Sequence, residues 1–160
     1  MRIVGNRNGV ASIGRSYVSN SVIDSNIATG IALIGSGSII NSSASHNGSY
    51  GASGGNDLIV IGSAFSGNGS RGIRVFGSSI IAGNTASDNQ GNGIVVAGGS
   101  STITGNIANN NVRFGISVRC PSTVVANFAQ DNGGIPNVPF PPNPNLNTSG
   151  TGCQIANNLF

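Results

Sequence analysis

Residues 72–96 read GIRVFGSSIIAGNTASDNQGNGIVV, and this stretch begins and ends with one pattern, a glycine followed by alternating apolar residues. The same glycine recurs along the chain at spacings of 21, 21, 21, 21 and 22 residues. A fixed period of about 20–50 residues is typical of a solenoid, in which every repeat forms one coil that packs on its neighbours. The repeating glycines are Gly9, Gly30, Gly51, Gly72, Gly93 and Gly115.

Three other positions repeat in the same register when residues are counted back from the next glycine. Stacked at a strand spacing of about 4.8 Å, the aliphatic positions would form interior columns. The asparagines belong at a corner, where each amide can hydrogen-bond the turn and the amides above and below, which predicts an asparagine ladder. Twelve places back stand Val18, Ile39, Val60, Ile81, Ile103 and Val124; seven back stand Ile23, Ala44, Phe65, Ala86, Ala108 and Ala129; four back stand Asn26, Asn47, Asn68, Asn89, Asn111 and Asn132.

The composition agrees with a β-solenoid. Only 7% of the residues are charged, and Glu, Lys and Trp do not occur, so the chain lacks the residues that the solvent face of a helical bundle needs. Leucine-rich repeats share the period but need a leucine framework, and a hexapeptide helix would repeat every 18 or so residues. We therefore predict an all-β parallel β-helix of about six to seven coils of 21–22 residues, with three short strands per coil.

These columns resemble the parallel β-helix repeat family, the pectate-lyase-like superfamily of secreted bacterial proteins, phage tailspikes and carbohydrate-active enzymes. The resemblance covers residues 9–132 and implies a right-handed parallel β-helix. It also implies an extracellular or periplasmic protein. The repeated residues reflect coil packing, and one fold hosts many functions, so the resemblance alone does not assign an activity.

The pattern divides the chain into β-helix coils over residues 1–134 and a Pro-rich C-terminal tail over residues 135–160. Residues 1–8 read as the end of an earlier coil, and we expect the tail to fold back on the last coil or on the side of the helix. A bond between Cys120 and Cys153 would join the tail to the last coil, and the segment 152–158 is similar to the closing segment of some secreted β-helix proteins. Two unrelated thiols are the alternative.

Candidate binding residues lie on the outer face of the first strand of each coil, where enzymes of the similar superfamily carry their acidic and basic residues. Arg71, Arg74, Arg113 and Arg119 converge there in the later coils, with Phe76 as a stacking platform. Guanidinium groups bind carboxylates in a bidentate manner, so this strip predicts a site for an acidic polysaccharide. The alternative is that these arginines only solubilise an apolar sheet face.

Catalysis is less well supported by the sequence. The first-strand face carries no carboxylate, whereas acid–base chemistry on a glycosidic or uronate substrate needs two positioned titratable groups. Asp88 and Asp131 share a corner column but lie two coils, about 9.6 Å, apart, too far to hold one calcium ion. We expect no catalytic residues, no metal and no cofactor.

The rest of that face is apolar, which is typical of an interface. We expect the tail or a second copy of the chain to cover it, and the exposed N-terminal edge is another place for self-association. The residues concerned are Ala11, Ile13, Ala32, Ile34, Val95 and Ala97.

Together these observations predict a non-enzymatic extracellular β-solenoid that acts as a structural or binding module, with acidic polysaccharide as the candidate ligand. The alternative is a polysaccharide lyase or uronate C5-epimerase. The net charge of +3 is modest, and no apolar run approaches the roughly 18 residues of a membrane span, so we expect neither a nucleic-acid nor a membrane partner.

Overall fold

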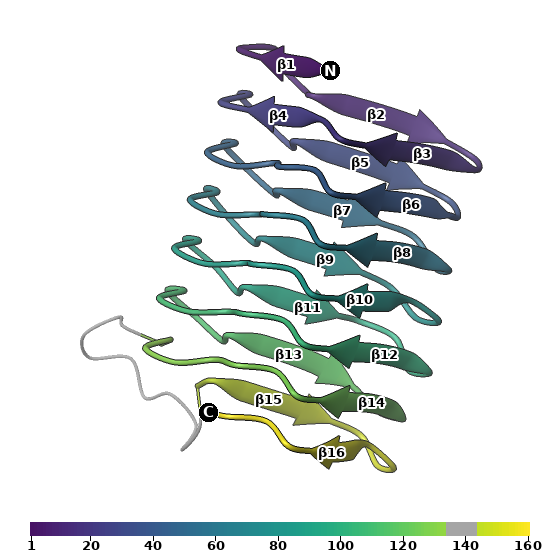
Figure 1. The fold of residues 1–160 in the computed structure, drawn as a ribbon, viewed down its shortest axis with the longest axis vertical. Helices are drawn as coiled ribbons and strands as arrows, with labels where there is room; N and C mark the ends of the chain where they lie inside the picture. Colours follow the sequence, from purple (N-terminus) through teal and green to yellow (C-terminus); the bar gives the residue numbers. More distant parts are fainter. Residues whose placement is uncertain (134–143) are drawn as a thin grey trace.

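The computed structural model describes residues 1–133 and 144–160, and these fold into coils stacked along one axis (Figure 1). All the strands described pair in parallel, and no described residue is helical, so the predicted all-β parallel β-helix is confirmed. Each coil contributes one strand to each of two seven-stranded sheets. The first sheet contains β2 (Val10–Ile13), β5 (Ile31–Ile34), β7 (Ala52–Gly54), β9 (Ile73–Val75), β11 (Ile94–Val96), β13 (Ile116–Arg119) and β15 (Leu146–Ser149).

The second sheet turns back across the coil, and the third side is much shorter. On the third side only β1 (Arg2–Val4) and β4 (Val22–Asp24) form strands, and later coils continue it with single bridges such as Ala64 to Thr85. Pairing of β1 with β4 places residues 1–8 as part of a coil. The second sheet contains β3 (Ser16–Ser19), β6 (Gly37–Ile40), β8 (Leu58–Ile61), β10 (Ile80–Ala82), β12 (Ser101–Thr104), β14 (Ser122–Val125) and β16 (Gln154–Ala156).

The aliphatic columns form the interior of the helix. Ile73 and Val75 of β9 point inward and are fully buried, while Arg74 between them points out, as the period of two in a strand requires. Ile81 of the second sheet and Phe65 of the third side complete the core and are also fully buried. Because each column continues from coil to coil, every coil buries its apolar residues against the coils on either side.

The asparagine ladder is also confirmed. Asn68 donates its amide to Oδ1 of Asn89 at 3.0 Å, and its own Oδ1 accepts from the amide of Asn47 at 3.2 Å. The backbone N–H of each asparagine donates to the next side chain as well, so the ladder satisfies buried turn groups that no strand can pair. The ladder runs from Asn26 and ends on Asn145, which accepts from Asn132 at 2.9 Å.

The recurring glycine is required by close packing next to the ladder. A Cβ on Gly72 would lie 2.7 Å from the carbonyl oxygen of Gly93 and 2.9 Å from both the amide nitrogen of Asn89 and the carbonyl oxygen of Phe65. These contacts are too short for any side chain, because they involve backbone and a buried amide. The 21-residue period of glycine therefore follows from the geometry of this corner.

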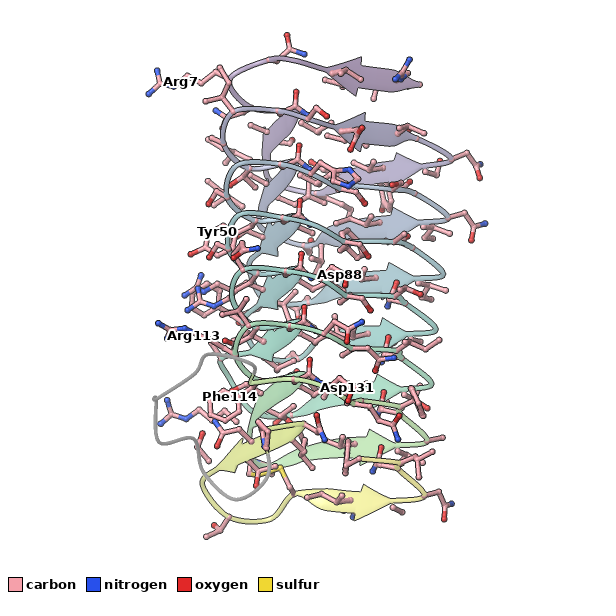
Figure 2. All side chains as sticks on the ribbon, turned by 90° about the vertical axis from the view of Figure 1, so that its left-hand side faces the viewer. Arg7, Tyr50, Asp88, Arg113, Phe114 and Asp131 are labelled. Carbon is pink, nitrogen blue, oxygen red and sulfur yellow. A yellow bond between two sulfur atoms is a disulfide. The ribbon has the colours of Figure 1, made fainter. Side chains whose placement is uncertain are left out.

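The corner just before the ladder holds residues in the left-handed region. Asn, Asp and Gly adopt this conformation more readily than other residues, which explains why two of the four aspartates lie here. Figure 2 shows Asp88 and Asp131 on this side of the stack. The positive φ angles are 54° at Ser25, 53° at His46, 66° at Gly67, 59° at Asp88, 55° at Asn110 and 54° at Asp131.

The C-terminal residues differ from the expected tail. Residues 146–156 add one more coil, in which β15 pairs with β13 and β16 pairs with β14 in the register of the coils before it (Figure 1). Cys120 and Cys153 form the predicted disulfide, with 4.9 Å between their Cα atoms. The Pro-rich stretch that suggested a tail falls largely in residues 134–143, outside the described residues, and the division of the chain at residue 134 stays a prediction.

The described part of the chain contains no helix long and apolar enough to cross a membrane.

Candidate functional site

The predicted arginines lie on one side of the helix, but they form two groups and not one continuous strip. Arg71 and Arg113 lie at the corner that precedes the first sheet, just before β9 and β13. Arg74 and Arg119 lie on the outer face of that sheet, in β9 and β13 themselves. Figure 2 shows Tyr50 and Arg113 along the edge of the stack that this corner forms.

The corner arginines line a cationic cleft of about 340 Å³. Arg71 and Arg113 come from coils two apart, and Gly91 of the coil between them also lines the cleft. Tyr50, Gln90 and Asn92 complete the polar lining with a phenol and two amides. The cleft therefore combines two positive charges with neutral groups that can donate hydrogen bonds to an anion.

Two arginines of this side rest on aromatic rings. The Arg71 guanidinium lies 5.6 Å from the centroid of the Tyr50 ring and donates to the Tyr50 hydroxyl at 3.1 Å. The Arg74 guanidinium lies 4.6 Å from the centroid of the Phe76 ring. Cation–π contacts of this kind hold a charged side chain in place without neutralising its charge.

An apolar hollow of about 260 Å³ lies beside the cationic cleft, on the face of the first sheet. Its lining combines the small residues Ser53 and Gly55 with the larger side chains of Tyr50, Phe76 and Ile34. Tyr50 lines both the hollow and the cleft. The sequence prediction named Phe76 and missed Tyr50, although Tyr50 directly precedes Gly51 at the position that Arg71 occupies in the next coil.

No acid neutralises these arginines. All four aspartates of the chain are described, and the side-chain ion pair found among the described residues joins Asp24 and His46 at 3.0 Å, at a different corner. Asp88 and Asp131 also lie on that other side (Figure 2), while Asp57 lines a depression next to the second sheet. Four guanidinium groups without a protein carboxylate create a locally positive surface on the first-sheet side.

The described residues on this side offer one side chain other than arginine that can exchange a proton, the phenol of Tyr50. No carboxylate or imidazole accompanies it, and no group of three His, Cys, Asp or Glu residues in the described chain is placed to hold a metal ion. The arrangement is suited to binding an anion more clearly than to transferring protons.

Arg119 lies apart from the other three predicted arginines. Arg71 and Arg113 line the cleft, and Arg74 contacts Phe76. Arg119 is exposed at the end of β13, next to the disulfide-bonded Cys120, and lines neither the cleft nor the hollow. The predicted set of five residues therefore separates into Arg71 with Arg113, Arg74 with Phe76, and Arg119 alone.

In the described part of the chain, nothing covers the apolar part of the first-sheet face. Ile13 is 85% exposed and Ile34 is 67% exposed in the single chain. Neither the last coil nor any other described segment lies on them. The expected cover by the tail or by a second copy stays a prediction.

The fold and the site together define a parallel β-helix with a cationic cleft and an apolar hollow on one side. The family model described as "Right handed beta helix region" matches residues 8–160 of the chain. The chain therefore belongs to the right-handed β-helix family, which confirms the resemblance inferred from the repeat. No curated protein matches the sequence.

Several solved structures are similar in fold, and their names describe epimerases of acidic polysaccharides. The periplasmic alginate epimerase AlgG aligns with a TM-score of 0.69 at 14% identity, over 96% of this chain and 44% of that one. The A-module of the mannuronan C-5 epimerase AlgE4 from Azotobacter vinelandii gives 0.61 at 20% identity, over 74% and 35%. The AlgE6 A-module from the same organism gives 0.58 at 19% identity, over 96% and 56%. The chain thus spans about a third to just over half of each of these structures, and the likeness is one of fold.

Proposed function

We propose that this chain is an extracellular or periplasmic β-helix module that binds acidic polysaccharide along the first-sheet side. The observation that carries the proposal is that no carboxylate of the protein neutralises Arg71, Arg74 or Arg113. Two of these arginines, Arg71 and Arg74, also rest on aromatic rings. A polyuronate supplies the missing carboxylates at regular intervals along an extended chain. Each guanidinium–carboxylate contact is a charge-assisted hydrogen bond, stronger than a neutral one.

Two further facts support the proposal. The structures that resemble this chain bear the names of alginate and mannuronan epimerases, one of them periplasmic. The disulfide between Cys120 and Cys153 is typical of an oxidising compartment.

The test is a titration of the chain with polymannuronate, with an uncharged mannan as the control polymer. We expect binding of polymannuronate only, and binding that weakens when salt is raised from about 0.1 to about 1 M, because the Debye length falls from about 10 to about 3 Å. Equal affinity for both polymers, or none for polymannuronate at low salt, contradicts the proposal.

The second candidate is a uronate lyase or C5-epimerase, and one contact favours it. The Tyr50 phenol lies 3.1 Å from a nitrogen of Arg71, so a proton-transferring group and a carboxylate-binding group are adjacent. Against it stands the lack of a carboxylate or imidazole on this side in the described chain. Incubation with polymannuronate separates the two functions, because a lyase produces an unsaturated end group that absorbs in the ultraviolet and an epimerase produces guluronate signals in the NMR spectrum. Neither product is expected.

A further inference from the structure

The apolar hollow and the cationic cleft share one lining residue, Tyr50. Ser53, Gly55 and Phe76 line the hollow with it, and Arg71 and Arg113 line the cleft with it. An apolar hollow next to a cationic cleft fits a ligand that has both an apolar part and an anionic part. A uronate unit has this division, since one face of its ring presents C–H groups and its C5 carries a carboxylate.

The geometry points to a single subsite for one uronate unit, and this inference rests on the proposed function. We infer that the C–H face of the sugar ring packs in the hollow against Tyr50 and Phe76. Its carboxylate then lies in the cleft and accepts hydrogen bonds from Arg71 and Arg113. The neighbouring units of the polymer continue along the helix axis in both directions.

The cleft is partly preorganised, because one of its two arginines is already ordered in the free protein. Arg71 is held by the Tyr50 ring and hydroxyl, so binding does not have to order a free side chain. Arg113 lines the same cleft from two coils farther along the helix. Both side chains are positively charged, so each of them attracts a carboxylate that enters the cleft.

The hollow makes the subsite selective for a sugar over a simple anion. Inorganic sulfate can occupy the cleft but cannot reach the apolar walls, and a neutral sugar can enter the hollow but leaves the cleft empty. The inferred subsite needs both contacts in one molecule. Its substrate class is therefore an anionic sugar, and Tyr50 is the residue that joins the two contacts.

The experiment measures the affinity of the full chain for a mannuronate tetramer by isothermal titration calorimetry, with a mannose tetramer and inorganic sulfate as probes of each half. The variants are Arg113→Ala, Tyr50→Ala and Tyr50→Phe, and the matched control is Arg15→Ala, an exposed arginine next to the second sheet. Circular dichroism and thermal unfolding of each variant establish that it is folded. Tyr50→Phe keeps the ring if Tyr50→Ala does not fold.

The subsite predicts that Arg113→Ala and Tyr50→Ala each weaken tetramer binding by about tenfold to a hundredfold, the effect of losing a hydrogen bond to a charged group or a stacked ring. Tyr50→Phe should weaken it by only a few-fold, and Arg15→Ala not at all. The mannose tetramer should bind at least about tenfold more weakly than the mannuronate tetramer, and sulfate should displace the latter only at much higher concentration.

Three results overturn the inference, and they differ in what they leave standing. If the wild-type chain binds mannuronate and Arg113→Ala and Tyr50→Ala bind it equally well, the polymer lies elsewhere on the protein and only the subsite is wrong. If sulfate competes as well as the tetramer, the ring makes no contact and the hollow has no part in recognition. If the wild-type chain does not bind mannuronate at all, the proposed function fails together with the subsite.

Discussion

Replacing Asn68 by alanine tests the asparagine ladder, since Asn68 lies in the middle of the ladder and is fully buried. Its side chain makes four hydrogen bonds: Oδ1 accepts from the backbone N–H and from the amide of Asn47, and its amide donates to Asn89 and to the carbonyl of Ala44. Alanine removes all four. Asn47 and Asn89 keep other contacts for their side chains, because the Asn47 amide still donates to Ile23 and Oδ1 of Asn89 still accepts from the backbone of residue 68.

Two buried backbone groups lose the partner that the ladder supplies, namely the N–H of Asn47 and the carbonyl of Ala44. A buried polar group left without a partner costs about 1–3 kcal/mol. The substitution should therefore lower the free energy of unfolding by about 2–6 kcal/mol. Asn68→Ser should cost less, because a hydroxyl can still accept from the N–H of Asn47, as Ser63 accepts from Ser42 at another corner.

The assay is urea unfolding followed by circular dichroism, with the slope of the transition compared between variants, since a repeat protein can lose cooperativity. Asn8→Ala is the matched control, because Asn8 is exposed and lies outside the ladder. We expect it to change stability by less than about 0.5 kcal/mol. If Asn68→Ala proves as mild as Asn8→Ala at an unchanged slope, the ladder does not stabilise the fold and this reasoning is wrong.

Three other predictions concern the packing of the coils. Replacing Cys120 and Cys153 by serine should lower the free energy of unfolding by about 3–4 kcal/mol in the chain-entropy model for a loop of 33 residues. Two thiols that react freely in the native wild-type protein would show that the bond is not formed. Gly72→Ala should destabilise by at least about 1–3 kcal/mol, because its Cβ would meet backbone atoms under 3 Å away, and a melting temperature equal to that of the wild type would contradict the proposed packing. Phe65→Ala should cost about 3–5 kcal/mol in urea unfolding, since the ring is fully buried between coils, and a cost below about 1 kcal/mol would mean that the column is not a tightly packed interior.

The interior of this protein could be predicted from sequence because stacking makes each position recur. Ile81, for example, pairs with Val60 of the preceding coil and Ile103 of the following coil. The six aliphatic residues of this column, each a weak signal alone, together give a strong one. Glycine and asparagine at the ladder corner recur for the same reason. A second ladder, which runs through Ser63, Asn84 and Asn106 at another corner, was missed because its residue type changes from serine in the early coils to asparagine in the later ones. A search for any hydrogen-bonding side chain, nine places before each glycine, would have found it.

The last coil was missed because its register breaks. Between Asn132 and β15 the chain inserts the Pro-rich stretch, so the next strand does not begin 21 residues after Gly115. Its strand also starts with Leu146, where earlier coils have valine, isoleucine or alanine after a glycine. The spatial repeat is nevertheless preserved, since Asn145 takes the place of the next ladder asparagine. Stacking tolerates an insertion at a corner, whereas a count along the sequence does not.

The residues of the candidate site do not recur from coil to coil, unlike those of the core. A repeat therefore indicates the fold but not the function. The position directly before each glycine holds Thr29, Tyr50, Arg71, Asn92 and Phe114 in successive coils, with no shared property. Asn92 is buried there, and the other four are partly exposed. The repeat does not fix the residue type at this position, so its partly exposed residues are free to contact a ligand, and an average over coils erases them. In a solenoid, the residues that differ from their column at an exposed position are therefore the ones to test for binding. Tyr50 and Arg71 were not evident as a pair because they lie 21 places apart in sequence, and only stacking brings the guanidinium over the ring.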